Sequence, residues 1–402
     1  MNQRALAGLN VIEYAEMVSG PYCARLLGDL GARVIKIEKP GQGDEARRHG
    51  PFWHNLPHSE GSGLFLYLNS NKQGLTLNLR NATGRNIFIK LLQDADVLVE
   101  NHPPGFMAEQ GCGAGELLRL YPRLVITSVT PFGQSGPNRD AKGGELISFH
   151  ASGVGYETPG DVEDLEAEPP LKAAGRQGGF QAGLVAATAT LLALFQRQLT
   201  GRGQVVDISE QEALLDAMRP SVAFATYAHR FLGRLRPAFR QIMPTKDGYV
   251  AAEPWDEPHF WEGWKRVMGQ PDWAESEAFQ TREARQQNWE ALWPLVTEWT
   301  QQHTKEEIYR AAQAEHLPSF PVNTPGEVVA SEHLRARSYF VEVEHPHTGK
   351  VRYPGALCRF SETPMTVRRP APLLGQDNEA ILCGQLGFTR EELVKLHESG
   401  TI

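Results

Sequence analysis

The sequence predicts an α/β protein built on a parallel sheet, and two observations support this fold class. Apolar strand patterns at Leu9–Ala15 and Ala32–Glu38 flank a short helix at Tyr22–Leu30, so the chain begins with a β-α-β unit. Such a unit places its two strands parallel, with a right-handed connection between them. Short hydrophobic strands then continue to alternate with helices along the first half of the chain. This alternation is typical of a parallel sheet covered by helices.

The elements after this unit continue the same pattern. The stretch "LFLYLNSNKQGLTLNL" alternates in hydrophobicity and breaks near Asn69–Gly74. A capped amphipathic helix at Asn81–Ala95 leads into a strand at Asp96–Asn101, and a further strand at Leu124–Thr130 ends in a Pro-Gly turn. In open parallel sheets, ligands bind beyond the C-terminal ends of the strands.

The segment Phe180–Leu199 predicts a long helix. It is rich in Ala and Leu, and residues at helical spacing form one apolar stripe: Phe180, Leu184, Ala187, Leu191 and Leu194. Gly201 and Gly203 end the helix. Its start is unusual, because helices favour Ser, Thr, Asp or Asn as the N-cap residue. Here "GRQGG" precedes the helix and offers no side-chain cap.

The second half of the chain changes in character. A strand at Gly203–Ser209 and a helix at Glu210–Met218 come first, and bulky and basic residues then mark a boundary over 219–240. After "MPTKDGYVAAEP", which predicts a turn and a strand, the chain is rich in Trp and mostly helical as far as about residue 330. Alternating strands then form a hairpin that turns at His345–Gly349, and an extended tail and a short helix complete the chain.

Length, charge and cysteine use limit the class of protein. The 402 residues suffice for two or three domains, and the formal net charge of −8 argues against a general binder of nucleic acid or anionic membranes. The sequence has no apolar run of about 18 residues and no signal-peptide pattern, so we expect no membrane span and a cytoplasmic protein. The cysteines are scattered without a CxxC pair, which indicates reduced thiols and no metal site: Cys23, Cys112, Cys358 and Cys383.

Several residues are candidates for chemistry. Glu38 ends the second strand, where NAD-binding proteins carry an acid for the ribose, but no GxGxxG precedes it. Lysines at strand ends or in turns, among them Lys72 and Lys142, suit an anionic ligand. The acidic loop Glu157–Pro170, which contains Asp161, is either a solvated loop or the source of a nucleophilic or basic carboxylate.

Several stretches occur together, in one order, from Leu9 to about Leu396: "SGPYCARLLGDLGARVIKIEKPGQGDEAR", "LNSNKQGLTLNL", "DVLVENHPPG", "LVITSVTPFGQSGP", "TGRGQVVDISEQEALL", "PTKDGYV" and "APLLGQDNEAIL". In this order and spacing they resemble the class III CoA-transferases, the family of formyl-CoA transferase, carnitine CoA-transferase and, more distantly, α-methylacyl-CoA racemase. The resemblance implies a Rossmann-type large domain whose parallel sheet is built from both chain ends, 1–223 and 331–402. It also implies a smaller inserted α+β domain, 224–330, and an interlocked dimer.

The same resemblance implies coenzyme A as the ligand, acyl-CoA and carboxylates as substrates, and no metal. The positions that match the family's CoA-binding motifs are Val18, Lys39, Asn71, Lys72, Asn101 and Lys142. Cationic and amide side chains among them suit the phosphates of CoA. For each lysine alone, a solvated surface charge is the alternative interpretation.

The family's chemistry needs one aspartate, which attacks the thioester carbonyl, forms a mixed anhydride and then an enzyme-bound CoA thioester. In the family this aspartate lies just ahead of the long helix, and aligning Ala182–Gly183 with the family puts Gly179 in its place. Val18 stands where formyl-CoA transferase has a glutamine that contacts the reacting carboxylate. Glu109 stands where the family usually has an arginine near a CoA phosphate.

These departures leave three interpretations open. In the first, the chain is the aspartate-lacking subunit of a heteromeric CoA-transferase of the aromatic-succinate type, and a homologous subunit bears the aspartate. In the second, the chain is a self-sufficient acyl-CoA transferase, isomerase or lyase with a relocated acid, for which Glu145 and Asp161 are candidates. In the third, it binds CoA without catalysis. The racemase branch explains none of this, because it needs the aspartate and also a histidine at Gly144, with which His150 is out of register.

Overall fold

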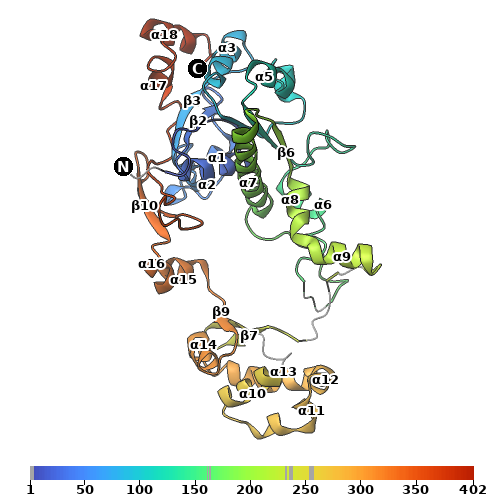
Figure 1. Ribbon diagram of the computed structural model, residues 1–402. Coiled ribbons are helices and arrows are strands. Elements are labelled where there is room, and N and C mark those ends of the chain that lie inside the picture. The colour runs from blue at the N-terminus through green and yellow to red at the C-terminus, as the bar shows by residue number, and fades with distance from the viewer. Residues whose placement is uncertain (1–3, 161, 163, 231–232, 235–238, 253–257) are drawn as a thin grey trace. The chain divides into compact units, whose positions relative to one another are not determined.

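The computed structural model describes residues 4–402 except 161, 163, 231–232, 235–238 and 253–257 (Figure 1). The chain divides into two compact units. The first, called the large unit below, combines residues 1–159, 170–233 and 337–402. The second, called the small unit, combines residues 160–169 and 234–336.

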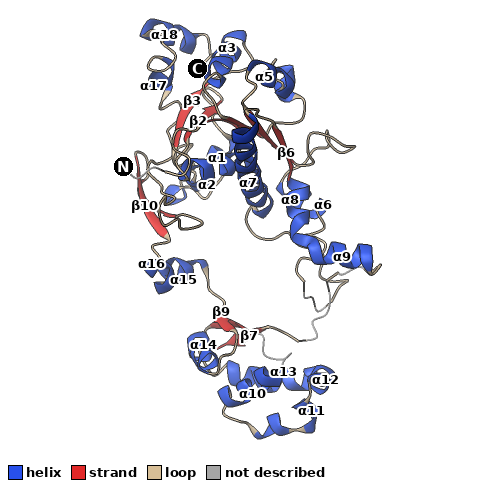
Figure 2. Ribbon diagram, viewed as in Figure 1, coloured by secondary structure: helices blue, strands red, loops and turns tan. Residues whose placement is uncertain are grey.

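A six-stranded parallel sheet forms the centre of the large unit. Figure 2 draws its strands in red, with helices around them. Its strand order is β3-β2-β1-β4-β5-β6. The strands are β1 (Asn10–Tyr14), β2 (Arg33–Glu38), β3 (Lys72–Thr76), β4 (Val97–Glu100), β5 (Val125–Thr130) and β6 (Val205–Ser209). The order reverses between β1 and β4, which is the point where doubly wound sheets bind their ligands. The predicted α/β class with a parallel sheet is confirmed.

Helices cover both faces of this sheet. On one face, α1 (Ser19–Asp29) and α7 (Gln177–Thr200) enclose a core with alternate strand residues such as Val11. The next residue, Ile12, belongs to the core on the other face, because successive strand side chains point to opposite sides. The helices of that second face are α3 (Ala82–Leu92), α5 (Ala114–Leu120), α17 (Asn378–Leu382) and α18 (Arg390–Glu398).

The helix α7 packs against α1 through small residues, and the two helices lie side by side in Figure 1. A Cβ atom at Gly183 would stand only 2.6 Å from the carbonyl oxygen of Ser19, so this close approach requires glycine. The predicted apolar stripe is therefore wrong in part. Ala187 and Leu194 are buried, but Leu184 is 41% exposed. The face of α7 that meets α1 is formed by small residues such as Gly183, since a large side chain there would hold the two helices apart.

α7 is also long and apolar enough to cross a membrane by length and composition. Half of its most apolar stretch is buried within the protein, and core helices meet the same criterion, so this is weak evidence for a membrane span. The remaining helices of the large unit are α2 (Gly63–Leu68), α4 (Phe106–Glu109), α6 (Glu145–Ala151), α8 (Glu210–Leu215) and α9 (Arg219–Tyr227). Short 3-10 turns lie at Glu45–Arg48, Trp53–Asn55 and Asp216–Met218.

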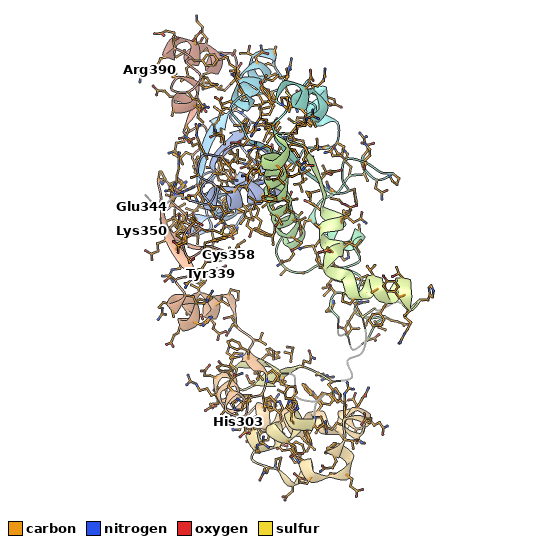
Figure 3. All side chains as sticks on the ribbon, viewed as in Figure 1. His303, Tyr339, Glu344, Lys350, Cys358 and Arg390 are labelled. Carbon is orange, nitrogen blue, oxygen red and sulfur yellow. The ribbon has the colours of Figure 1, made fainter. Side chains whose placement is uncertain are left out.

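The C-terminal part of the large unit adds a hairpin and the helices α17 and α18. The hairpin pairs β10 (Phe340–His345) with β11 (Gly349–Pro354), as the sequence predicts. Glu344 and Lys350, both labelled in Figure 3, are partners in its register.

The expectation that both chain ends contribute strands to the parallel sheet is wrong, because all six strands lie before residue 210. The outer edge of β3 is covered instead by side chains at the start of α17. Asp377 accepts the Gly74 amide hydrogen bond at 2.8 Å, and Asn378 accepts that of Thr76 at 2.9 Å. These bonds satisfy backbone donors that a further strand would otherwise pair.

The small unit combines helices with a three-stranded antiparallel sheet of order β7-β8-β9, formed by Ile242–Thr245, Gly248–Ala252 and Ser319–Pro321. Its helices are α10 (Pro258–Val267), α11 (Glu277–Gln280), α12 (Arg282–Gln287), α13 (Trp289–Thr300), α14 (Lys305–Ala314), α15 (Pro325–Ala330) and α16 (Glu332–Ala336), with a 3-10 turn at Asp272–Glu275. Trp261, Trp264 and Trp289 lie in its core. His303, labelled in Figure 3, stacks on Trp299 with ring centroids 4.2 Å apart.

Candidate active site

A cavity of about 650 Å³ lies at the C-terminal edge of the central sheet, where the strand order reverses. The loops that follow β1 and β4 form part of its wall, and the starts of α6, α7 and α8 form another part. Its lining residues are Glu16–Ser19, Glu45, Asn101–Pro104, Val129, Pro131, Arg139–Glu145, Arg176, Gly179 and Glu210. The cavity therefore brings together Val18, Asn101, Lys142, Glu145 and Gly179, which the sequence had singled out separately.

The Glu145 carboxylate caps the N-terminus of α7. Its Oε1 accepts a hydrogen bond from the Gly178 amide and its Oε2 one from the Gly179 amide, each at 3.0 Å. The Lys172 ammonium lies 3.7 Å from Oε1. Free amides and the positive end of the helix dipole favour an anion at this position. A side chain from α6 thus supplies the cap that the local sequence "GRQGG" lacks.

Val18 fills the space beside Gly179. It is buried at the N-cap of α1 and faces the first turn of α7. A Cβ atom at Gly179 would stand 2.9 Å from the Val18 Cβ and 3.0 Å from its Cγ1, which is closer than carbon atoms pack. An aspartate at 179 therefore requires Val18 to move. The departures at these two positions, separate in the sequence, form a single packing contact.

A second carboxylate in the cavity belongs to Glu210. It is the first residue of α8, directly after β6, and its Oε2 accepts a hydrogen bond from Ser148 Oγ at 3.0 Å. Burial raises the pKa of Glu210 and the charge of Glu145 adds to this, while hydrogen bonds from Ser148 and Ser19 oppose it. The cavity thus holds one carboxylate bound by helix amides and another whose charged form is disfavoured by burial.

Asn101 ties the loop after β4 to the loop after β1. Its side-chain amide donates to the Glu16 carbonyl at 2.7 Å, and its Oδ1 accepts from the Glu16 amide at 2.9 Å. The next residue, His102, packs between Tyr14 and Phe106, with ring centroids 4.3 and 4.5 Å away. Burial lowers the pKa of His102 to about 4, so this imidazole is neutral at neutral pH.

Three cationic side chains line the cavity: Arg139, Lys142 and Arg176. Arg139 pairs with Asp140 at 3.2 Å, and both are exposed. Lys142 is exposed and has no carboxylate at ion-pair distance within the described part of the chain. Arg176, the N-cap of α7, contacts the Nδ1 atom of His49 at 3.3 Å. The cavity therefore offers cationic donors that suit an anionic ligand.

Lys39 and Glu38 lie outside the cavity lining. The Lys39 ammonium is 2.7 Å from the Oε1 of Glu16, and Glu16 does line the cavity. The Glu38 carboxylate is buried and accepts two bonds from Arg47, at 2.7 and 2.8 Å. Since Arg47 occupies both of its oxygens, Glu38 does not present the free acid that binds ribose in NAD proteins.

Lys72 is fully buried inside the large unit and does not line the cavity. Its ammonium lies 2.6 Å from the Oε2 of Glu13 and donates to the Pro21 carbonyl and to Asn69 Oδ1, each at 2.8 Å. Burial lowers its pKa to about 8. Lys36 joins the same network, 2.8 Å from the other oxygen of Glu13. The donors of Lys72 are thus engaged within the fold.

Asn71 is also buried and holds the C-terminal segment in place. Its amide donates to Asp29 Oδ1 at 2.6 Å and to the Thr366 carbonyl at 2.8 Å, and its Oδ1 accepts from the Arg368 amide at 2.7 Å. The structure therefore gives no support to CoA contacts at Asn71 and Lys72. CoA contacts at Val18, Lys39, Asn101 and Lys142 stay predictions.

Three further sequence candidates are Asp161, Glu109 and His150. Asp161 lies outside the described residues. Glu109, at the end of α4, is exposed, and His150, in the last turn of α6, packs against Phe149. Neither lines the cavity. Within the described ranges, no group of three or more His, Cys, Asp or Glu is placed to hold a metal ion.

Glu210 and Arg176 are among the cavity residues that escaped the sequence reasoning. Glu210 directly follows the strand that ends at Ser209, so the rule that ligands bind beyond C-terminal strand ends could have pointed to it. Arg176 is the charged residue of "GRQGG", where attention went to the glycines. Its importance depends on the cavity, which no local pattern reveals.

The chain matches CoA-transferase family III over residues 6–378. It is 31% identical to a succinyl-CoA–D-citramalate CoA-transferase from Chloroflexus aurantiacus, over 99% of this chain and 98% of that protein. Two further relatives are the subunits of a succinyl-CoA–L-malate CoA-transferase from the same species. The β subunit is 30% identical over 99% of this chain and 98% of its own length, and the α subunit 31% over 98% and 92%.

A solved structure shares the fold over nearly the whole chain. It is a CAIB/BAIF family protein from Brucella suis, with a TM-score of 0.84 and 26% sequence identity, and the match covers 95% of this chain and 100% of that chain. The sequence match spans most of the chain, and the parallel sheet and its switch-point cavity suit the same family. The chain belongs to CoA-transferase family III, whose members act on CoA thioesters.

Proposed function

We propose that this chain is a subunit of a heteromeric CoA-transferase, that it lacks the nucleophilic aspartate, and that a homologous subunit bearing the aspartate performs the transfer. The observation that carries this proposal is the contact between Val18 and Gly179. Two carbon atoms of Val18 stand within 3.0 Å of the place that a Cβ at position 179 would occupy. The site is therefore packed around a glycine and does not simply have a hole where a nucleophile was removed.

The position of Glu145 supports the same proposal. Its carboxylate holds the amides of Gly178 and Gly179, which are the donors that a carboxylate at position 179 would lie beside. These donors are thus already satisfied inside the chain. If a partner subunit supplies the nucleophile, these amides are not needed for catalysis in this chain, and Glu145 can occupy them.

The relatives support a two-subunit assembly. One of the similar enzymes is named with α and β subunits, and this chain is about equally similar to both. In that assembly, the partner of this chain is a homologue of the same family, and the substrates are an acyl-CoA and a carboxylate. Interlocking of the two subunits and an aromatic-succinate acceptor are parts of this proposal.

Expression alone and together with an aspartate-bearing homologue tests the proposal. We expect no CoA transfer from this chain alone, and transfer from the co-purified complex. Replacing the partner's aspartate with alanine should abolish transfer, whereas Glu145→Gln in this chain should leave it measurable. A stable homodimer of this chain that transfers CoA by itself would contradict the proposal.

A second candidate function is self-sufficient CoA transfer with Glu145 as the acid. The favourable observation is that the Glu145 carboxylate lines the cavity at the start of α7. One of its oxygens would attack the thioester carbonyl, and the C–S bond would break. The CoA thiolate would depart, and a mixed anhydride between Glu145 and the acyl group would form. The thiolate would then attack the glutamyl carbonyl, which gives a glutamyl-CoA thioester and the free acid. An acceptor carboxylate repeats the two exchanges in reverse and restores Glu145.

Chemical trapping separates the two candidates. After incubation with an acyl-CoA, hydroxylamine converts an acylated carboxylate to a hydroxamate that mass spectrometry locates. A mark at Glu145 that disappears in Glu145→Gln would establish the second candidate. A hydroxamate at another residue that persists in this variant, or no hydroxamate at all, would reject it. Binding of CoA without turnover, with or without a partner, would indicate a non-catalytic CoA-binding protein.

A further inference from the structure

We propose that Arg176 determines substrate specificity in this cavity, because its guanidinium binds a second, distal carboxylate on the acyl group or the acceptor. The substrates it selects are then dicarboxylates. This inference rests on the proposed function, in which an acyl-CoA and a carboxylate meet in the cavity.

The location of Arg176 places it near the reacting position. It is the N-cap of α7 and lines the cavity together with Gly179. Three residues separate the two positions, and one turn of helix advances about 5 Å. Arg176 and position 179 therefore both lie at the start of α7, on the wall of the same cavity.

The charge of Arg176 is available to a ligand. Its side-chain contact is with the Nδ1 of His49, at 3.3 Å, and the other ring nitrogen of His49 lies 3.5 Å from Glu45. The guanidinium is therefore held by an imidazole nitrogen, and no carboxylate of the described residues comes within ion-pair distance of it.

The other cations at the cavity are differently engaged. Lys172 lies against Glu145 at 3.7 Å, and Arg139 pairs with Asp140 at 3.2 Å. Lys142 is exposed and is the position expected to meet a CoA phosphate. Arg176 is half-buried and has a planar fork of donors, which matches a carboxylate through two parallel hydrogen bonds.

The acids of the cavity explain why such a cation matters. Glu145 and Glu210 both line the cavity wall, so a further carboxylate there lies among acidic side chains and needs a cation of its own. A monocarboxylic acyl group brings no charge there once it is esterified to CoA. A dicarboxylic acyl group keeps its distal carboxylate, and Arg176 offsets the repulsion that this charge meets. The phosphates of CoA are separated from the thioester by the long pantetheine arm, so they do not reach the same place.

Calorimetric titration of the purified full-length chain with three probes tests the inference: CoA, butyryl-CoA and succinyl-CoA. The two acyl groups have the same number of carbons and differ in the distal carboxylate. We expect the wild-type chain to bind succinyl-CoA more tightly than butyryl-CoA. Arg176→Gln should weaken succinyl-CoA binding by about 10- to 100-fold and leave the other two affinities nearly unchanged. Arg176→Lys should restore part of the preference.

Arg48→Gln is the matched control, because Arg48 is exposed, carries the same charge and does not line the cavity. It should change none of the three affinities. An equal loss for all three probes in Arg176→Gln would overturn the inference, since the arginine would then bind CoA itself. Equal binding of both acyl-CoAs by the wild type would also overturn it. Absence of CoA binding would reject the proposed function as well, whereas an Arg176-dependent preference without turnover would reject only catalysis by this chain.

Discussion

The Glu145 carboxylate and the Gly179 amide are joined by a hydrogen bond of 3.0 Å, although 34 positions separate them in the sequence. This bond links the start of α6 to the start of α7. It gives a long helix without a local cap an acceptor for its first free amides. The same side chain therefore caps α7 and forms part of the cavity wall.

Replacing Glu145 with glutamine should lower the free energy of unfolding by about 1–3 kcal/mol. Glutamine keeps the shape but has one acceptor oxygen and no charge for the two amides and the helix dipole. Urea denaturation at neutral pH measures the change. Glu116→Gln, at an exposed position in the first turn of α5, is the control and should stay within about 0.5 kcal/mol of wild type. A loss no greater than that of the control would show that the bonds to α7 contribute little.

Adding a methyl group at Gly179 should destabilise the protein because of the contact with Val18. We expect Gly179→Ala to cost about 1–3 kcal/mol in urea unfolding, as overpacked cores do. The control is Gly115→Ala in α5, where a Cβ meets nothing within 4 Å, and we expect a small gain in stability there.

A double-mutant cycle with Val18→Gly isolates this contact. The cost of Gly179→Ala should be smaller in the Val18→Gly background, because the atoms nearest to the new methyl group are gone. For the same reason, Gly179→Asp alone should yield no transfer activity. Equal costs in the two backgrounds would mean that the two residues do not compete for space.

The pH dependence of stability should report the ionisation of Glu100. Burial raises its pKa to about 7, from an ordinary value of 4.5, although its carboxylate accepts the His102 amide at 2.8 Å. The folded protein then holds this proton more tightly than the unfolded chain does. Its contribution to stability is complete below pH 4.5 or so and declines as the pH rises to about 7. Glu100→Gln removes this decline, so at about pH 8 the variant should be more stable than wild type by about 1–3 kcal/mol. Urea unfolding over a pH series checks this, and parallel curves for the two proteins would contradict it.

Lys72 and Lys142 should behave differently when replaced with methionine. Lys72→Met breaks a buried ion pair with Glu13 and should lower the free energy of unfolding by about 3–5 kcal/mol, without a specific loss of CoA affinity in the folded protein. Lys142→Met, on the surface, should leave stability unchanged within about 0.5 kcal/mol and weaken CoA binding. Urea unfolding and calorimetry with CoA measure the two effects. A stable Lys72→Met protein that no longer binds CoA would show that Lys72 contacts CoA.

The sheet could be predicted from the sequence because each strand and helix leaves its own local pattern. The region Leu9–Glu38 has alternating apolar segments, and these patterns led directly to β1, α1 and β2. The packed face of α7 could not be predicted in this way. It depends on how closely α1 approaches α7. This close approach places Gly183 in the contact between the two helices, whereas Leu184 is partly exposed to solvent.

The candidate site was predicted in part. The resemblance identified Gly179 as the unusual position and the same cavity contains Glu145, but the bond between them joins residues too far apart for any local motif. Lys72 was predicted to contact CoA, and its place in the sheet gives this prediction no support. It is the first residue of β3, so it does not lie at the C-terminal edge where ligands of a parallel sheet bind. A lysine near the end of a strand is a candidate for ligand binding only if that end is the C-terminal one.

The packing around the start of α7 also limits how this chain can evolve. A single substitution that places an aspartate at position 179 would push against Val18 and add a second carboxylate to amides that Glu145 already holds. An aspartate at this position therefore requires changes at three positions in different elements, and the substitution at position 179 by itself brings a penalty. The order of such substitutions therefore matters, because space beside Val18 has to be made before a larger residue at position 179 is tolerated.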